Sequence, residues 1–314
     1  MTGPRLVIAG GTGVIGHHLV TAARDYEVTI LTRGSGSLVP SVAKPFLWNP
    51  QAARNGDVAE LERVASVLEG AYAVVNLAGA SIGEGRLGPA HRRRVLESRL
   101  DATGTLVEAF LRTSDPPGVW YQASATGYYG DRGDEVLTET AGPGDQPSLA
   151  DLVLRWEAAT APVRERVRLV VGRIGLVIAD DAPAWQRFLQ PIKAFVGGPL
   201  GGGRQWYAWI DADDQARATL HLLENAASSG AYNVTAPEPV RQGELTRAAA
   251  RRLRRPAFVP TPAVALRLAL GAAADLLLLP SVRAVPARLE TEGFEFLWPD
   301  LGALMDKLYG RPGP

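Results

Sequence analysis

The sequence contains no cysteine in its 314 residues. This absence excludes disulfide bonds, thiolate metal sites and cysteine nucleophiles. The chain also lacks an excess of either charge, because lysine plus arginine and aspartate plus glutamate both number 33. Balanced charge provides no overall field toward nucleic acid or an anionic membrane, so we expect neither as a partner. The four histidines are scattered without ligand spacing, and we expect no metal site.

The sequence also lacks a long uninterrupted hydrophobic run. Its most apolar segment, 263–279, contains Arg267 and Asp275 and is bounded by prolines. It is shorter than the ~20 apolar residues that a membrane span requires. We therefore expect a buried helix of a soluble domain there. A strand-like run begins within a few residues of Met1 and leaves no room for a signal peptide, so the cytoplasm is the expected location.

A glycine-rich turn near the N-terminus is the most informative feature that is present. An apolar run over residues 6–9 leads into Gly10, and an apolar-periodic stretch begins after Gly13. Gly10 or Gly11 would permit a sharp turn between a strand and a helix. Gly13 would let the backbone approach a pyrophosphate, and Gly16 would let the helix lie against the strand. Both GxxGxxG and GxGxxG are satisfied, which favours this interpretation over an ordinary turn. The predicted cofactor-binding residues are Gly10, Thr12, Gly13, Val14, Ile15 and Gly16.

The residues after the second predicted strand indicate which dinucleotide binds. NAD enzymes place an acidic residue there to bind the ribose 2′-hydroxyl. This chain has Thr32, Arg33 and Gly34, and no acid. A guanidinium favours the 2′-phosphate of NADP, although a solvated loop arginine is the alternative. We predict NADP(H) as the cofactor, with Thr32 and Arg33 in its site.

Strand-like and helix-like segments alternate through the first two thirds of the chain. Strands are expected near residues 27–32, 44–48, 73–77, 119–124 and 168–173, and helices near 58–68, 89–112 and 149–164. This alternation predicts an α/β fold with a doubly wound, mostly parallel Rossmann-type sheet. Residues 1–175 are predicted to form the NADP-binding domain, to which helix 212–225 and strand 231–234 return. A smaller, mainly helical substrate domain is predicted for 176–211 and 236–314.

Hydroxyl groups follow the strand predicted at 119–124. Ser124 ends this strand, and Tyr128 and Tyr129 follow in a flexible turn. Hydroxyl groups at a strand's carboxyl end suit proton transfer to a substrate carbonyl or alcohol, although in turns they are usually backbone caps. An earlier turn at the end of strand 73–77 is predicted to pack against the adenosine side of the cofactor. Its residues are Leu77, Ala78 and Gly79.

The glycine-rich loop 197–209 suits a mobile segment that closes on a ligand. We expect Arg204, Gln205 and Trp209 to contact the substrate, the alternative being a connection whose tryptophans pack between domains. Aspartates follow the loop, but they open a predicted helix. Acids stabilise a helix dipole there, so these are not expected to bind metal. They are Asp211, Asp213 and Asp214.

Taken together, these motifs resemble an extended or atypical short-chain dehydrogenase/reductase. Within that superfamily, the chain closely resembles the NAD(P)-binding epimerase-like family that is often labelled a cell-division inhibitor. The resemblance runs nearly end to end, and it includes the motifs at 10–16, 76–79, 124–130, 155–157, 173–177, 197–201, 209–214 and 285–289. It implies a Rossmann-type domain that holds NADP(H), with Arg173 among the cofactor residues. It also implies a characteristic C-terminal domain and Ser124 as the carbonyl-orienting serine.

The chain departs from this superfamily at one pair of positions. Extended dehydrogenases place Tyr-x-x-x-Lys on the helix after the serine loop, where the lysine perturbs the tyrosine hydroxyl for proton exchange. Counted back from Glu157, those positions hold Leu149 and Val153, and neither can transfer a proton. The nearest hydroxyl candidates are Tyr128 and Tyr129.

Two functions are compatible with these residues. The first is an NADP(H)-dependent oxidoreductase or nucleotide-sugar-epimerase-like enzyme with a small-molecule substrate. Hydride would move between the nicotinamide and a carbon near Ser124, and Tyr128 or Tyr129 would supply the proton. The second is a non-catalytic or weakly catalytic NADP(H)-binding sensor or scaffold, which the missing Tyr-x-x-x-Lys pair favours. Either function is compatible with a homodimer.

Overall fold

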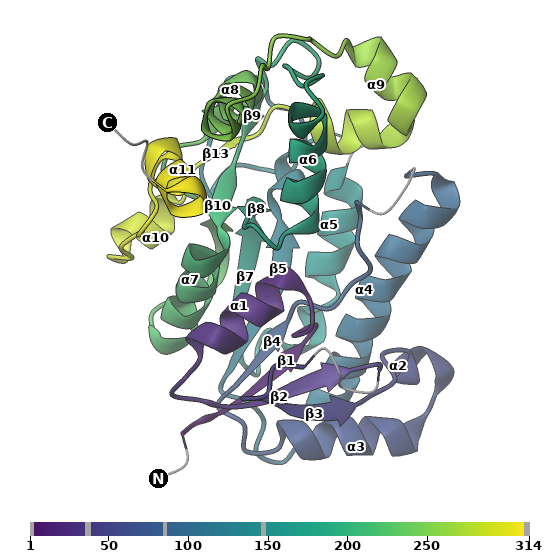
Figure 1. The fold of residues 1–314 in the computed structure, drawn as a ribbon. Coiled ribbons are helices and arrows are strands. Elements are labelled where there is room, and N and C mark those ends of the chain that lie inside the picture. The colour runs from purple at the N-terminus through teal and green to yellow at the C-terminus, as the bar shows by residue number, and fades with distance from the viewer. Residues whose placement is uncertain (1–2, 35–38, 84–86, 146–148, 311–314) are drawn as a thin grey trace.

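The computed structural model describes residues 3–34, 39–83, 87–145 and 149–310. Its centre is a seven-stranded sheet in the order β11-β7-β5-β4-β1-β2-β3 (Figure 1). Every neighbouring pair is parallel, which confirms the predicted doubly wound α/β architecture. The strands are β1 (Arg5–Ala9), β2 (Glu27–Thr32), β3 (Lys44–Leu47), β4 (Ala73–Asn76), β5 (Val119–Ala125), β7 (Arg168–Ile174) and β11 (Gly230–Val234).

Helices cover both faces of this sheet. The alternation of side chains along β1 shows why: Leu6 and Ile8 enter one apolar cluster, whereas Val7 and Ala9 enter another. The first cluster includes residues of α1 (Val14–Ala22) and α7 (Ala212–Glu224). The second includes residues of α3 (Val58–Leu68) and α4 (Pro89–Phe110). The short helix α2 (Ala52–Asn55) precedes α3, and α5 (Leu149–Ala158) packs beside α4 and β5.

The strand order reverses between β1 and β4. From β1 the chain adds β2 and β3 on one side, and it then crosses over to add β4, β5 and β7 on the other. In open α/β sheets, ligands bind in the crevice at the carboxyl ends of the strands where the order reverses. The turns that follow Ala9 and Asn76 lie at this point.

The C-terminal region forms a smaller and mainly helical lobe above this edge of the sheet (Figure 1). Short strand pairs support it, and they do not join the central sheet. Its helices are α6 (Pro183–Lys193), α8 (Gln242–Leu253), α9 (Ala263–Leu270) and α11 (Leu301–Tyr309), whereas α10 (Ala287–Thr291) packs against β11 of the central sheet. The paired strands are β8 (Leu176–Ile178) with β10 (Trp209–Asp211), β9 (Trp206–Tyr207) with β12 (Val240–Arg241), and β6 (Val136–Leu137) with β13 (Arg283–Ala284). The domain boundaries given above stay a prediction.

The apolar segment 263–279 is not the single buried helix that its composition predicts. Helix α9 is followed by Gly271, whose φ of 60° and ψ of −138° cannot continue a helix. A π-type turn, Ala274–Leu278, comes next. Along α9 only Leu266 is buried, whereas Val264 is 64% exposed. Among the described helices, none is long and apolar enough to cross a membrane.

The aspartates that open α7 stabilise structure, as expected. The Asp211 carboxylate accepts hydrogen bonds from the backbone N–H groups of Asp213 and Asp214. It also accepts two bonds from Lys307 Nζ of α11, at 2.6 and 2.7 Å, which attaches the C-terminal helix to the start of α7. Within the described ranges, no three His, Cys, Asp or Glu side chains are arranged to hold a metal ion.

Candidate functional site

The glycine turn after β1 has the backbone geometry that a dinucleotide site requires. Gly10 has a φ of 85°, and a Cβ there would lie 2.7 Å from the carbonyl carbon of Leu77. A Cβ at Gly16 would lie 2.4 Å from Gly11 Cα, so α1 can approach the turn only because residue 16 is glycine. A Cβ at Gly13 would meet only the Gly10 carbonyl oxygen, at 3.6 Å. Space over Gly13 is therefore open to a ligand.

The start of α1 provides hydrogen-bond donors at the same place. Gly13 is the N-cap, and no side chain caps the helix. The first N–H groups of a helix have no partner inside it, and they attract anions together with the helix dipole. Here those groups belong to Val14, Ile15 and Gly16, and Thr12 beside them is exposed. These residues fit the pyrophosphate of a dinucleotide.

The end of β2 lies next to this turn, because β2 pairs with β1. Thr32 is buried, and its Oγ1 accepts a 3.3 Å hydrogen bond from the Gly34 N–H. Arg33 follows with an exposed side chain. No acidic residue occupies the position where an NAD enzyme binds the ribose hydroxyls. An exposed guanidinium at this position is suited to binding a phosphate group.

A second turn, after β4, forms the other wall of the crevice. The Leu77 N–H donates to the Ala9 carbonyl at 2.8 Å, and the Ala78 N–H donates to Asn76 Oδ1 at 3.2 Å. The Asn76 amide is fully buried and donates to Thr103 and Gln122. This buried amide positions residues 77–79 against the glycine turn.

Ser124 belongs to a buried network and does not stand alone at the strand end. Its hydroxyl donates a 2.5 Å hydrogen bond to Oε1 of Glu157 on α5. Arg173 of β7 donates to both oxygens of the same carboxylate, at 3.1 and 3.3 Å. Burial alone would lower the pKa of Arg173, but its hydrogen bonds and ion pair with Glu157 outweigh burial and raise that pKa. The Glu157 carboxylate is thus held between a hydroxyl and a permanent cation.

The two tyrosines after Ser124 have different environments. Tyr129 is fully buried; its hydroxyl donates to Asn233 Oδ1 at 2.7 Å and accepts from Arg173 at 3.2 Å. Burial also raises the pKa of Tyr129, despite the nearby Arg173 charge. Tyr128 is half-buried, and the Arg173 guanidinium lies 3.4 Å from its ring centroid.

These positions correct two of the expected roles. Tyr129 is enclosed by protein, so its hydroxyl cannot meet a substrate in this structure. Arg173 is 6% exposed and bound to Glu157 and Tyr129, so its guanidinium supports the network and does not reach toward a cofactor. Tyr128 is the more accessible of the two tyrosines.

Helix α5 carries Leu149 and Val153, the two residues at the positions expected for the usual tyrosine and lysine. Val153 is buried. Leu149 packs against the turn at Gly127, where a Cβ would lie only 3.2 Å from the leucine Cβ. Proton transfer by residues 149 and 153 is therefore excluded.

Arg99 of α4 is a crevice residue that the sequence analysis missed. Its Nη1 donates to the Ala80 carbonyl at 2.9 Å, and its side chain covers Gly79. The guanidinium also lies 4.8 Å from the Trp156 ring centroid. Burial lowers the pKa of Arg99 to about 10, and its Nε has no hydrogen-bond partner within the described residues. Arg99 follows other arginines on a polar helix, so nothing in the sequence distinguishes it.

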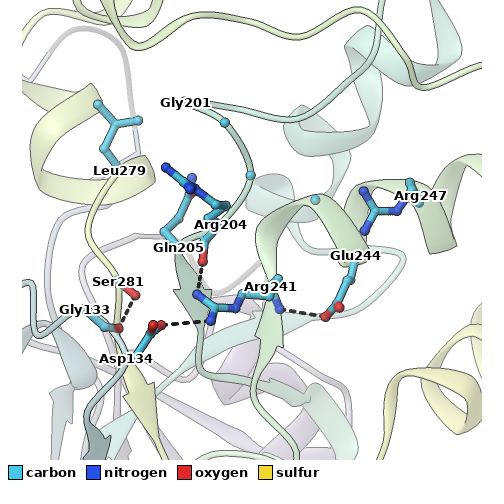
Figure 2. Close-up of a pocket in the computed structure, with 13 residues that line it drawn as sticks. Gly133, Asp134, Gly201, Arg204, Gln205, Arg241, Glu244, Arg247, Leu279 and Ser281 are labelled. Atoms are coloured by element: carbon cyan, nitrogen blue, oxygen red, sulfur yellow. Dashed lines mark hydrogen bonds and ion pairs between the residues drawn. The ribbon is translucent and has the colours of Figure 1, made fainter.

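A cavity of about 650 Å³ lies in the C-terminal lobe (Figure 2). Three arginines, Arg204, Arg241 and Arg247, line it together with the buried amide of Gln205. Arg241 is held in place by an ion pair with Asp134 at 2.8 Å. Two of the predicted substrate residues, Arg204 and Gln205, therefore line a cavity.

Trp209, the third predicted substrate residue, has a different position. Its side chain is fully buried in the apolar cluster of the C-terminal lobe. Its indole N–H donates to the Glu238 carbonyl at 2.9 Å. Trp209 is therefore a core residue, as the packing alternative proposed, and we withdraw its substrate role.

Comparison with known proteins agrees with this geometry. Residues 6–235 match the NAD dependent epimerase/dehydratase family, and residues 261–308 match a domain of unknown function, DUF1731. An epimerase family protein of Mycobacterium leprae is 34% identical over 317 residues, covering 98% of this chain and 96% of the relative. One from Staphylococcus aureus strain N315 is 32% identical over 311 residues, covering 96% and 98%.

Solved structures are also similar. The crystal structure of the human epimerase family protein SDR39U1 with NADPH has a TM-score of 0.84 and 29% identity, and it covers 97% of this chain and 99% of that one. A nucleoside-diphosphate sugar epimerase from Corynebacterium glutamicum has a TM-score of 0.75 and 29% identity, with 98% and 59% covered. The sheet, the glycine turn and these matches lead to one conclusion. The chain belongs to the NAD-dependent epimerase/dehydratase family and has a DUF1731 domain in its C-terminal region.

Proposed function

We propose that the protein is an NADP(H)-dependent oxidoreductase or nucleotide-sugar-epimerase-like enzyme that acts on a small molecule. One observation carries the choice of cofactor. The glycine turn and the uncapped start of α1 lie beside an exposed Arg33, and no acidic residue follows β2. The similar human structure with NADPH supports the same nucleotide.

Different residues of this chain would bind different parts of the cofactor. The N–H groups of residues 14–16 would bind the pyrophosphate, and Arg33 would bind the 2′-phosphate. Residues 77–79 would cover the adenosine side. Bound NADP(H) would supply or accept the hydride. In this proposal Arg173 does not contact the cofactor, and it holds the Glu157 carboxylate in place.

Ser124 and Tyr128 would handle the proton of the substrate oxygen. Because the Ser124 hydroxyl donates its hydrogen to Glu157, its oxygen presents lone pairs to a neighbouring group. It would therefore accept a hydrogen bond from a substrate alcohol, and Glu157 would accept the serine proton. In the reverse direction the Ser124 hydroxyl would turn from Glu157 and donate to a carbonyl oxygen. The half-buried Tyr128 is the second hydroxyl available for this step.

The C-terminal lobe, residues 176–211 and 236–314 in the proposed division, would bind the substrate. Arg204 supplies a guanidinium to its cavity, whereas the buried Gln205 amide donates to the Leu200 and Leu278 carbonyls and would shape the cavity wall. The similar protein from C. glutamicum is described as a nucleoside-diphosphate sugar epimerase, which favours a sugar nucleotide as the class of substrate. Guanidinium groups suit the phosphates of such a molecule.

A second function, an NADP(H)-binding sensor or scaffold with little catalysis, is favoured by one observation. The positions of the usual tyrosine and lysine hold the apolar Leu149 and Val153. The two functions differ in a direct measurement. An oxidoreductase mixed with NADP+ or NADPH and a panel of alcohols and carbonyl compounds should change the nicotinamide absorbance. An epimerase returns the hydride to its substrate, so it should instead change the configuration of a sugar nucleotide, which NMR detects. A protein that binds the cofactor tightly but changes neither this absorbance nor the configuration of any sugar nucleotide would support the sensor function.

A further inference from the structure

Positive charge is concentrated in one segment of the C-terminal lobe. Residues 245–289 contain eight arginines and a single acidic residue, Asp275, although the whole chain has no net charge. Asp275 is already paired with Arg267, at 2.9 Å. Arg251, Arg254 and Arg255, at and beyond the end of α8, are exposed. Two further arginines, Arg252 and Arg288, are paired with Asp306 and Glu292. The exposed positive charge at the end of α8 therefore comes from Arg251, Arg254 and Arg255.

Large apolar side chains are exposed in the same region. Phe258 is 77% exposed, Val264 is 64% exposed and Phe195 is 55% exposed. Val196 and Val259, beside the two phenylalanines, are exposed as well. Isolated exposed apolar residues are ordinary, but a group of them indicates a surface that meets a partner or a membrane.

Backbone hydrogen bonds place these segments side by side. The Val259 N–H donates to the Gly197 carbonyl at 3.2 Å, and the Thr261 N–H donates to the Pro199 carbonyl at 2.9 Å. The Arg255 guanidinium lies 4.3 Å from the Phe195 ring centroid. In Figure 1 the chain between α8 and α9 runs along the outer end of the lobe, opposite the end where α3 and β3 lie. We call this surface the apolar–basic edge, and its residues are Phe195, Arg254, Arg255, Phe258, Val259 and Val264.

The charge of the apolar–basic edge distinguishes between its potential occupants. A second copy related by two-fold symmetry would bring the same arginines together, and like charges would repel. An anionic phospholipid surface complements the charge and needs no matching shape. Aromatic and aliphatic side chains enter the headgroup boundary, while arginines bind phosphates and keep their alkyl stems in apolar surroundings.

We propose that the apolar–basic edge binds peripherally to the surface of a membrane rich in anionic phospholipid. Phe195, Phe258 and Val264 enter the headgroup region, and Arg254 and Arg255 pair with lipid phosphates. The proposal revises the expectation that the protein has no membrane partner, which rested on whole-chain charge and on the lack of a spanning segment. Surface binding requires neither a net charge nor a span.

The test is co-sedimentation of the full chain with large phospholipid vesicles. We expect binding to phosphatidylcholine vesicles that contain about 30 mol % phosphatidylglycerol, and several-fold weaker binding to pure phosphatidylcholine. High salt should release the protein, because it screens the arginine–phosphate attraction. Arg254→Gln with Arg255→Gln should weaken binding by about tenfold. Phe258→Ser with Val264→Ser should also weaken it, even at low salt.

Matched controls lie away from the apolar–basic edge. Val42 is 74% exposed and precedes β3, and Val42→Ser should leave vesicle binding unchanged. Arg164→Gln with Arg166→Gln removes the same charge from an exposed turn before β7, and it should have little effect. Equal binding to neutral and anionic vesicles, or none to either, would overturn the proposal. So would light scattering that shows a dimer which Phe258→Ser dissociates, because the edge would then be an interface between copies.

Discussion

The Ser124 hydroxyl donates a 2.5 Å hydrogen bond to the carboxylate of Glu157, which lies 33 residues further along the chain. Arg173 donates to both oxygens of that carboxylate, including the oxygen that accepts from Ser124. Counted back from Glu157, the positions expected for the usual tyrosine and lysine hold Leu149 and Val153 in this chain. Glu157 therefore connects the proposed chemistry of the site with the stability of the fold.

Replacing Ser124 should separate catalysis from folding. Ser124→Ala removes the hydroxyl but keeps the ion pair between Glu157 and Arg173. With a substrate in hand, we expect turnover to fall by about 100-fold or more, whereas the affinity for NADPH changes little. Steady-state kinetics and a cofactor titration measure the two effects. Unchanged turnover would remove Ser124 from the mechanism.

Replacing Glu157 should instead weaken the fold. Glu157→Gln leaves the buried Arg173 guanidinium without its charged partner, so we expect the free energy of unfolding to fall by about 3 kcal/mol. The matched control is Glu165→Gln, because Glu165 is exposed and its replacement should change stability by less than about 0.5 kcal/mol. Urea denaturation of both variants gives the comparison. Equal stabilities would show that the carboxylate charge is not needed there.

Two glycines that lie in helices should respond oppositely to alanine. Gly16→Ala would bring a Cβ to 2.4 Å from Gly11 Cα, and it should cost about 2 kcal/mol and disrupt cofactor binding. A Cβ added at Gly104 in α4 would have nothing within 4 Å, so Gly104→Ala should stabilise the protein by about 0.5–1 kcal/mol. Thermal unfolding with and without NADPH tests both. A tolerated Gly16→Ala with full NADPH affinity would contradict the close packing of α1.

Alkaline pH should destabilise the protein partly through Tyr121. Burial raises the pKa of Tyr121 to about 12, above its value of about 10 in an unfolded chain. The fold favours the protonated phenol, so its contribution is complete below pH ~10 and is lost as the pH rises toward ~12. Between pH 8 and pH 11, the free energy of unfolding should therefore fall by about 1 kcal/mol less in Tyr121→Phe than in the wild type. Parallel stability curves for the two proteins would refute this assignment.

Local sequence was sufficient where the structure depends on local contacts. The alternation of apolar strands and helices predicted the parallel sheet, and the spacing of Gly10, Gly13 and Gly16 predicted the turn before α1. Each of these features depends on residues a few positions apart. Arg33 and the missing acid are equally local, since both directly follow β2.

Features that depend on distant contacts were not predictable from sequence. In the sequence, Glu157 served only as the position from which the tyrosine and lysine positions were counted. In the structure, its carboxylate accepts hydrogen bonds from Ser124 and Arg173. The glycine-rich loop around Trp209 suggested that its ring contacts a ligand. In the structure its side chain is fully buried in the C-terminal lobe. Segment 263–279 looked buried because it is apolar, whereas the chain ends α9 at Gly271 and leaves Val264 exposed. Apolar composition indicates a preference for burial, and only the tertiary fold decides whether burial occurs.

The glycine turn and Arg33 are together proposed to select NADP(H). Parallel titrations of the wild type and Arg33→Asp with NADPH and NADH test this selection most directly, by isothermal calorimetry on protein purified without added nucleotide. We expect the wild type to bind NADPH at least about tenfold more tightly than NADH, because Arg33 pairs with the 2′-phosphate. Arg33→Asp should abolish or reverse this preference. Equal affinity of the wild type for both nucleotides, or an unchanged preference in the variant, would contradict the proposed role of Arg33.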